Sequence, residues 1–207
     1  MPNNTDISSL KFVIKEAIET IRKSSDFESI AIRLKENGDF PYLLQIGFVE
    51  SFVQKENTLN VKDAEGNLVL EADGTPFVEC MCGNVIKKRT NPKHQYFTKE
   101  GAFWTNSTTQ LLGNLTKTER QEIGRTRNTC HDYGYESVAL IPIHVDDEVV
   151  GLIQINDSHE NRFTLEKIEK YQQLADQLGT IVFDILQFYE KAANAFKEAN
   201  NLEYIEK

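Results

Sequence analysis

Three cysteines are the residues of this sequence whose types and spacing are best suited to chemistry. Cys80 and Cys82 are one residue apart in the run "FVECMCGNVIKKRTNP", and Cys130 follows in "RNTCHDYGYES". A cysteine thiolate is a nucleophile and also a ligand for soft metal ions. The three side chains therefore indicate a ligand set, a redox pair, or simply small hydrophobic side chains in buried segments.

The metal, haem and redox alternatives differ in what they need. A tetrahedral zinc or iron–sulfur site would need a histidine, His131 or His94, beside the cysteines, and C-x-C is tighter than the usual C-x-x-C spacing. Haem would be held through a cysteine sulfur with a histidine as axial ligand, but the C-x-x-C-H attachment motif is absent. A thiol switch would pair Cys80 or Cys82 with Cys130 on oxidation.

The polar run "FWTNSTT" at 103–109 contains the only tryptophan of the chain, Trp104. Trp104 and Asn106 could line a pocket in which an indole ring and several hydrogen-bonding groups hold a small ligand. The alternative is a buried tryptophan followed by a helix that Thr105 or Asn106 caps.

Two arginines in the run "GRTRN", Arg125 and Arg127, offer an anion site. A guanidinium group binds a carboxylate or another oxyanion through two parallel hydrogen bonds. The same side chains would instead be solvated, or paired with Glu119 or Glu122, in an ordinary surface segment.

Composition argues against several classes of function. The net charge is −9 and the pI about 5.0, whereas nucleic-acid-binding proteins present clustered lysine and arginine. The first ten residues show no signal peptide, and no run approaches the ~18 apolar residues of a membrane span. An odd number of cysteines favours a reducing compartment. We therefore expect a soluble, cytoplasmic protein that binds neither nucleic acid nor membrane.

Hydrophobic spacing predicts the elements that position these residues. Residues 7–21 have apolar side chains at helical spacing. Residues 28–36 alternate as a strand with one buried face, and 40–48 predict a second strand. Residues 61–79 contain turn signals at two glycines. The middle, 81–134, has no sustained period and should mix short helices with loops.

Regular patterns return in the last third of the chain. Residues 136–145 and 149–157 predict a hairpin of two well-buried strands. A long helix, capped by Thr164, has an unbroken apolar stripe over 168–199. A helix of ~30 residues is ~45 Å long, more than a domain of this size can cover. Its far end should therefore pack on a second copy of the chain.

The order of elements predicts an α+β fold. We expect a central antiparallel sheet with the N- and C-terminal helices on one face and pocket loops with short helices on the other. The chain divides into an N-terminal helix (1–25), a core (26–160) and a long C-terminal helix (161–207). The pocket should be formed by residues of about 80–131.

Two stretches of the sequence resemble the GAF domain family. "GYESVALIPIHVDDEVVGLIQINDSHENRFTLEKIEKYQQLADQLGTIV" resembles the C-terminal half of a GAF domain, with a strand ending "x-P-I", a strand that opens with glycine, and a helix opening "F-T". "CMCGNVI…FTKEGAFWTNSTTQLL…RTRNTCHDYGYES" is similar to a Cys-rich GAF subgroup of microbial sensor histidine kinases and PAS/GAF signalling proteins. The likeness covers about Phe27 to Ala192.

The resemblance implies a sensory domain of a signal-transduction system. Such domains bind a small molecule on one face of the sheet, form homodimers through their terminal helices, and signal to a sensor kinase or another partner. Some redox-sensing archaeal relatives hold haem, which implies haem or another Cys/His-held cofactor here, the alternative being none. Phytochrome-type relatives attach a bilin near the position of Cys130-His131, but the segment that follows is shorter in this chain.

An enzyme is the alternative that the resemblance leaves open. Free methionine-(R)-sulfoxide reductases are single GAF domains with three cysteines, and "MCG" at 81–83 and Cys130 match their pattern loosely. One thiolate would attack the sulfoxide, and a second cysteine would resolve the sulfenate. The carboxylates that hold the substrate amine would fall near Glu136, which is out of register by one, and Asp157. We expect a sensory domain without catalytic residues, with this activity as the alternative.

Overall fold

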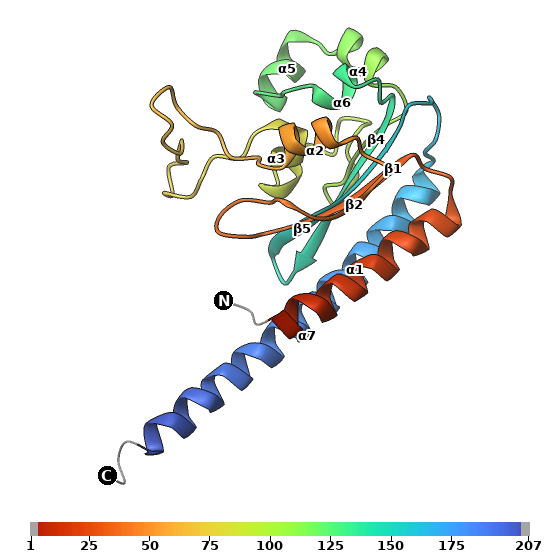
Figure 1. Ribbon diagram of the computed structural model, residues 1–207. Helices are drawn as coiled ribbons and strands as arrows, with labels where there is room; N and C mark the ends of the chain where they lie inside the picture. The colour runs from red at the N-terminus through yellow and green to blue at the C-terminus, as the bar shows by residue number, and fades with distance from the viewer. Residues whose placement is uncertain (1–3, 204–207) are drawn as a thin grey trace.

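The computed structural model describes the backbone of residues 4–203 and the side chains of 10–185, 187, 188 and 191. Within this range one antiparallel sheet of five strands has the order β2-β1-β5-β4-β3 (Figure 1). The strands are β1 (Ser29–Leu34), β2 (Tyr42–Ile46), β3 (Phe103–Thr105), β4 (Ser137–Val145) and β5 (Glu148–Asp157). The predicted α+β class is therefore confirmed.

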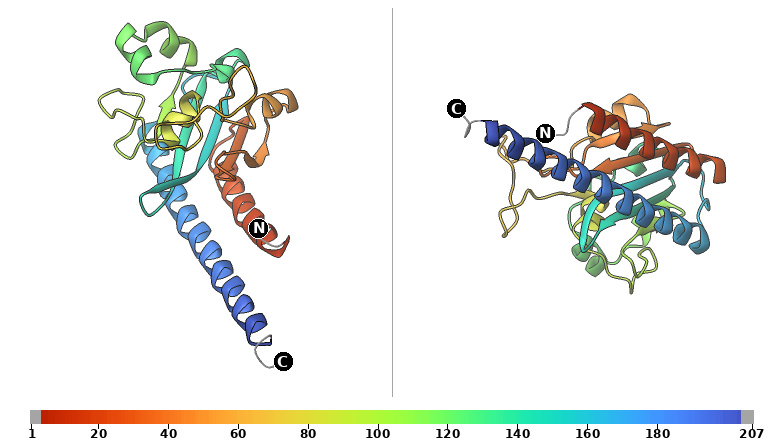
Figure 2. Two further views of the ribbon diagram at one scale, coloured as in Figure 1. Left: turned by 90° about the vertical axis from the view of Figure 1, so that its left-hand side faces the viewer. Right: turned by 90° about the horizontal axis from the view of Figure 1, so that it is seen from below.

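The two faces of the sheet are covered by different helices. The terminal helices α1 (Asn4–Ser24) and α7 (Leu165–Glu203) lie side by side on one face (Figure 2). Short helices and loops cover the other face, as predicted for the irregular middle. These helices are α2 (Glu50–Glu56), α3 (Cys80–Ile86), α4 (Thr108–Asn114), α5 (Lys117–Ile123) and α6 (Thr129–Asp132). A separate apolar cluster fills the space on each side of the sheet.

The prediction of one buried face for the first strand is wrong. β1 lies between β2 and β5, and an apolar cluster packs against each face of the sheet there. Ile30 and Ile32 pack against the terminal helices, whereas Ala31 packs into the cluster on the other side. Arg33 is fully buried. Arg33 occupies a polar position of the alternating pattern. That position therefore belongs to a second buried face of the strand and not to a face exposed to solvent.

The predicted hairpin of β4 and β5 is confirmed, and it is the central scaffold of the fold. Leu140 pairs with Gln154, and the same register places Phe103 of β3 opposite Leu140. Thus β3, β4 and β5 present one continuous floor toward the short helices. β3 itself is not predicted by the sequence, because three residues are too few to show an alternation.

The C-terminal helix is longer than predicted and is fixed closely to the sheet. The backbone amide of Lys167 donates to the Thr164 hydroxyl, which confirms the predicted cap. Gly179 approaches β4 so closely that an added Cβ would lie 1.8 Å from the His144 carbonyl oxygen. Beyond this contact α7 continues past the sheet (Figures 1 and 2). No helix within residues 4–203 is long and apolar enough to cross a membrane.

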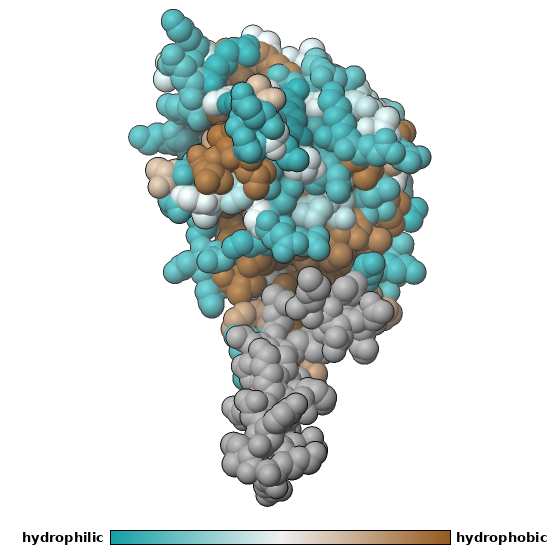
Figure 3. Space-filling view, turned by 60° about the vertical axis from the view of Figure 1, so that its left-hand side comes forward, coloured by the Kyte–Doolittle hydropathy of each residue, from teal (hydrophilic) through white to brown (hydrophobic). Residues whose placement is uncertain are grey.

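A long excursion over residues 60–78 projects from the domain (Figure 1). The predicted turns are confirmed, with positive φ at Gly66 and Gly74. Only isolated bridges join the arms of this described segment, so it contains no named strand. Leu68 and Leu70 are exposed, and Figure 3, which brings this side forward, shows apolar surface set among hydrophilic surface.

Candidate functional site

Helix α3 begins in an unusual backbone conformation at Cys80. Cys80 has φ of +70°, in the left-handed region that residues other than glycine rarely adopt. Its amide donates to the Arg125 carbonyl oxygen at 3.2 Å, which holds this turn in place. Cys80 lies at the start of the helix, and the segment before it forms only a bridge between Asn60 and Val78. The helix therefore starts at Cys80.

Cys80 and Cys82 lie one residue apart at the start of α3, and the ionisation of each depends on the other. The hydrogen bond from Cys82 lowers the pKa of Cys80 to about 7, although burial acts in the opposite direction. The same bond, which Cys82 donates, and burial raise the pKa of Cys82 well above its usual value. Near neutral pH, Cys80 therefore exists in large part as a thiolate, while Cys82 retains its proton.

The structure brings the three cysteines to one narrow cavity between the sheet and the short helices. Cys80, Cys82, Cys130 and His131 line a space of ≈ 70 Å³. The rest of its wall is mostly apolar, with Phe103, Leu111, Leu115, Ile123, Val138 and Leu140. The cysteines are free thiols in this arrangement.

The cavity does not fit haem, since pockets for ligands of that size measure about 300–1,000 Å³. The described thiols and His131 also do not appear together as a close group of metal-ligating atoms. Among the described residues, the one group of three His, Cys, Asp or Glu ligand atoms within 4.8 Å comprises Glu28, Asp157 and His159. The other candidate histidine, His94, instead lies between two carboxylates, those of Glu119 and Glu122.

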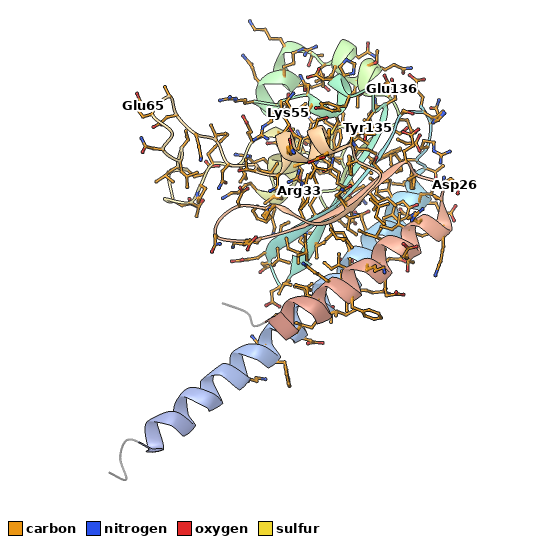
Figure 4. All side chains as sticks on the ribbon, in the orientation of Figure 1. Asp26, Arg33, Lys55, Glu65, Tyr135 and Glu136 are labelled. Atoms are coloured by element: carbon orange, nitrogen blue, oxygen red, sulfur yellow. The ribbon has the colours of Figure 1, made fainter. Side chains whose placement is uncertain are left out.

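Behind Cys130 lies a buried polar network that extends across the sheet. The Gln154 side-chain amide lies 3.8 Å from the Cys130 sulfur and accepts a hydrogen bond from the Tyr42 hydroxyl at 3.0 Å. The Arg33 guanidinium, labelled in Figure 4, stacks on the Tyr42 ring and lies 3.5 Å from the centre of that ring. It donates to the backbone oxygens of Phe40 and Glu56. Burial raises the pKa of Cys130 to about 12, so Cys130 stays protonated.

Sequence reasoning missed Arg33 and Gln154. The sequence contains a signal for both residues: each is a polar residue in a strand, and the residues directly before and after it are apolar. Where both faces of a sheet are covered, such a residue is buried, and a buried polar group needs hydrogen-bond partners.

The structure places Arg127 in an ion-pair network beside the cavity. Its Nε lies 2.6 Å from the Glu79 carboxylate, which also pairs with Arg125 at 2.8 Å. A second nitrogen of Arg127 donates to the Thr58 carbonyl oxygen. Glu79 immediately precedes Cys80, so this network fixes the start of α3. Both arginines are thus paired with a glutamate, but with Glu79 and not with the two residues of α5.

Trp104 and Asn106 border a different, wider space. They line a surface groove of ≈ 660 Å³. Leu111 and Leu115 line both this groove and the thiol cavity, so their segment lies between the two. The Asn106 side chain exchanges two hydrogen bonds with the backbone of Phe163, which anchors the entry to α7. Helix α4 is capped by neither Thr105 nor Asn106, because the Ser107 hydroxyl accepts from the Gln110 amide.

The two carboxylates of the enzyme alternative have other contacts. Glu136 accepts hydrogen bonds from Ser107 and Thr109 and so fixes the start of α4. Figure 4 shows it at the edge of the domain, away from Arg33. Asp157 is buried and pairs with Arg162 at 3.1 Å. Neither carboxylate lines the thiol cavity.

Comparison with known proteins identifies one family. The family model described as "GAF domain" matches residues 13–182. This match begins within α1 and ends before Ala192, so it is shifted toward the N-terminus relative to the likeness expected from the sequence. A comparison with curated proteins finds no match.

Several solved structures share the fold at low sequence identity. A blue-light-absorbing form of the PixJ GAF domain from Thermosynechococcus elongatus is 10% identical, with a TM-score of 0.57, and the match covers 96% of this chain and 98% of that one. A type II free methionine-R-sulfoxide reductase from Thermoplasma acidophilum is 11% identical (TM-score 0.53, 86% and 95%). The GAF domain of a Bacillus halodurans two-component sensor histidine kinase is 13% identical (TM-score 0.51, 86% and 96%). At these identities the likeness shows the fold alone.

Proposed function

This chain belongs to the GAF domain family, and from that premise we propose that it is a sensory domain of a signalling protein whose response element is the Cys80–Cys82 thiol pair. The family membership supports the sensory role, and the geometry of α3 supports the thiol chemistry. A cofactor held by Cys130 and His131 is not part of the proposal, because the cavity is too small for haem.

One observation carries the proposal: the two cysteines lie at a helix start with a left-handed backbone and line one cavity. The left-handed backbone at Cys80 is a conformation that persists only where the surrounding structure enforces it, and such sites cluster at functional positions. The pKa of about 7 makes Cys80 a nucleophile at neutral pH. Cys82 already contacts it and can form a disulfide once Cys80 is oxidised.

A path for the signal leads from α3 through the sheet to the long helix. Helix α3 packs against β4 and β5, and α7 packs against the opposite face of β4. A disulfide between Cys80 and Cys82 would change the first turn of α3. Because Gly179 holds α7 against the backbone of His144, a shift of β4 would be transmitted to α7.

The partners in this proposal are a second copy of the chain and a kinase or another signalling protein. Phe12 of α1 is 65% exposed and Ile181 of α7 is 39% exposed, so both terminal helices present apolar side chains that a second copy could cover. The three segments 1–25, 26–160 and 161–207 would then act as dimer helix, sensory core and signalling helix.

Oxidation followed by peptide mass mapping tests the proposal. We expect mild oxidation to give a Cys80–Cys82 disulfide and to leave Cys130 reduced. Hydrogen exchange should then change in α3 and α7. Cys130→Ser is the matched control and should respond as the wild type does. A protein in which Cys80 stays reduced, or one whose α7 exchange is identical in both states, contradicts the proposal.

The enzyme alternative receives less support from the structure. Glu136 and Asp157 are engaged in protein contacts outside the thiol cavity. A coupled assay on free methionine sulfoxide, with Cys130→Ser as the control, distinguishes the two functions. We expect no turnover, and turnover that depends on Cys130 would favour the enzyme.

A further inference from the structure

The wall of the thiol cavity contains a hydroxyl group without a partner. Thr129, at the start of α6, is 1% exposed and lines the cavity together with Cys80, Cys82 and Cys130. Its Oγ1 makes no hydrogen bond to any described residue. A buried hydroxyl without a partner is unfavourable, and most such groups in folded proteins bind water or a ligand.

The size of the cavity restricts what Thr129 can bind. A volume of ≈ 70 Å³ is well below the about 300–1,000 Å³ of pockets that hold drug-sized ligands, so the cavity admits only a small molecule. The mostly apolar wall disfavours a charged ligand, since an ion would lose its hydration without gaining partners. The occupant is therefore a small, uncharged molecule that can hydrogen-bond to one hydroxyl.

We propose that this cavity binds a small hydroperoxide, hydrogen peroxide itself, with the Thr129 hydroxyl as its hydrogen-bonding partner, Cys80 as the attacking thiolate and Cys82 as the resolving thiol. The inference rests on the proposed function, because it names the oxidant to which the same thiol pair responds. It adds Thr129 as a binding residue and excludes bulky oxidants by size.

The reaction balances with hydrogen peroxide as the only oxidant. The Cys80 thiolate attacks one peroxide oxygen, so that an S–O bond forms and the O–O bond breaks. The hydroxide that leaves takes up a proton and becomes water. The Cys82 thiol then loses its proton and attacks the Cys80 sulfur, and the second hydroxide leaves with that proton as water. Two thiols lose two electrons, and one peroxide yields two waters.

A series of oxidants of increasing size tests the cavity. Hydrogen peroxide, tert-butyl hydroperoxide, cumene hydroperoxide and glutathione disulfide are each added to the reduced protein, and Cys80 oxidation is followed by mass mapping. We expect the rate constant to fall at least tenfold from hydrogen peroxide to cumene hydroperoxide, with glutathione disulfide slower still. Equal rates for hydrogen peroxide and cumene hydroperoxide would overturn the size argument while leaving the thiol pair as the response element.

Thr129→Val tests the hydroxyl, because valine keeps the shape and removes the oxygen. We expect oxidation by hydrogen peroxide to slow about tenfold, while the midpoint of thiolate absorbance at 240 nm stays that of the wild type. Thr126→Val is the matched control: Thr126 lines the same cavity, but its hydroxyl already donates to Asn128. An unchanged rate in Thr129→Val, or an equal loss in both variants, would overturn the role of Thr129.

The two tests separate this inference from the function on which it rests. If no oxidant in the series modifies Cys80, both the sensory thiol pair and the peroxide site are wrong. If every oxidant modifies Cys80 at a similar rate, only the peroxide site is wrong.

Discussion

The side chains of Cys80 and Cys82 interact at the start of α3, and this interaction lowers the pKa of Cys80 and raises the pKa of Cys82. Cys80 becomes the better thiolate and Cys82 the better proton donor. Backbone groups of Met81 and Arg127 also lower the pKa of Cys80, whereas burial and the nearby Glu56 raise it. The order of reaction, attack by Cys80 and resolution by Cys82, follows from this asymmetry.

Replacing Cys82 with alanine should therefore raise the pH at which Cys80 ionises. Without the hydrogen bond, burial is the dominant influence, and burial raises the pKa of a thiol. We expect the midpoint of thiolate absorbance at 240 nm to move from about pH 7 into the alkaline range. Cys130→Ser is the control and should retain the wild-type midpoint. An unmoved midpoint in Cys82→Ala would show that another group sets the ionisation of Cys80.

The ionisation of Cys80 also predicts how stability depends on pH. The pKa of Cys80 is lowered in the folded state from 9.0 to about 7, so its thiolate stabilises the fold. That contribution is complete above pH 9 and is lost as the pH falls toward 7. In urea titrations of the reduced protein, we expect stability relative to Cys80→Ser to rise between pH 7 and pH 9. A difference that stays constant across this window would contradict the lowered pKa.

Gly179→Ala should destabilise the protein, because the new methyl group would meet the His144 carbonyl oxygen at 1.8 Å. Helix α7 would have to move away from β4, at a cost of about 1–3 kcal/mol in the free energy of unfolding. Gly113→Ala is a matched control in α4, where an added Cβ meets nothing within 4 Å. Alanine favours the helix there, and we expect a gain of about 0.5–1 kcal/mol. Urea unfolding measures both, and equal effects would contradict the close contact.

Arg33→Met should destabilise the core, although methionine has a similar length. The change leaves the buried carbonyl groups of Phe40 and Glu56 without their donor, at about 1–3 kcal/mol for each. Arg33→Lys should restore little, because a lysine cannot reproduce the planar fork or its stacking on Tyr42. Arg22→Met, at an exposed ion pair, is the control and should change the free energy of unfolding by less than about 0.5 kcal/mol. A loss at position 33 no larger than this would contradict the network.

The parts of the fold that the sequence predicts are those in which the pattern is long. The hairpin of β4 and β5 and the helix after Thr164 show a sustained period, and both are confirmed. β3 is too short to show one. The buried second face of β1 depends on the strands and helices that surround it, so alternation alone suggested solvent at Arg33.

The candidate site was predictable only in part, for a physical reason. The sequence predicts a pocket formed by residues of about 80–131, and Cys80, Cys82 and Cys130 do line one cavity. The separation of Trp104 from the thiols depends on where α4 lies, which no local pattern encodes. Cys80 has a left-handed φ, which sequence patterns do not predict at a cysteine.

Phe12→Lys tests the dimer that the terminal helices imply. Phe12 is 65% exposed in one chain, and its burial by a second copy would contribute about 1.5–3 kcal/mol. A charged side chain there should therefore raise the dissociation constant at least tenfold in sedimentation while leaving the circular dichroism of the monomer intact. Leu70→Lys makes the same change at a 57% exposed residue of the projecting excursion, away from the terminal helices, and should leave the dimer unchanged. If both variants sediment as the wild type does, α1 is not part of a dimer interface, and the signal would have to leave through α7 alone.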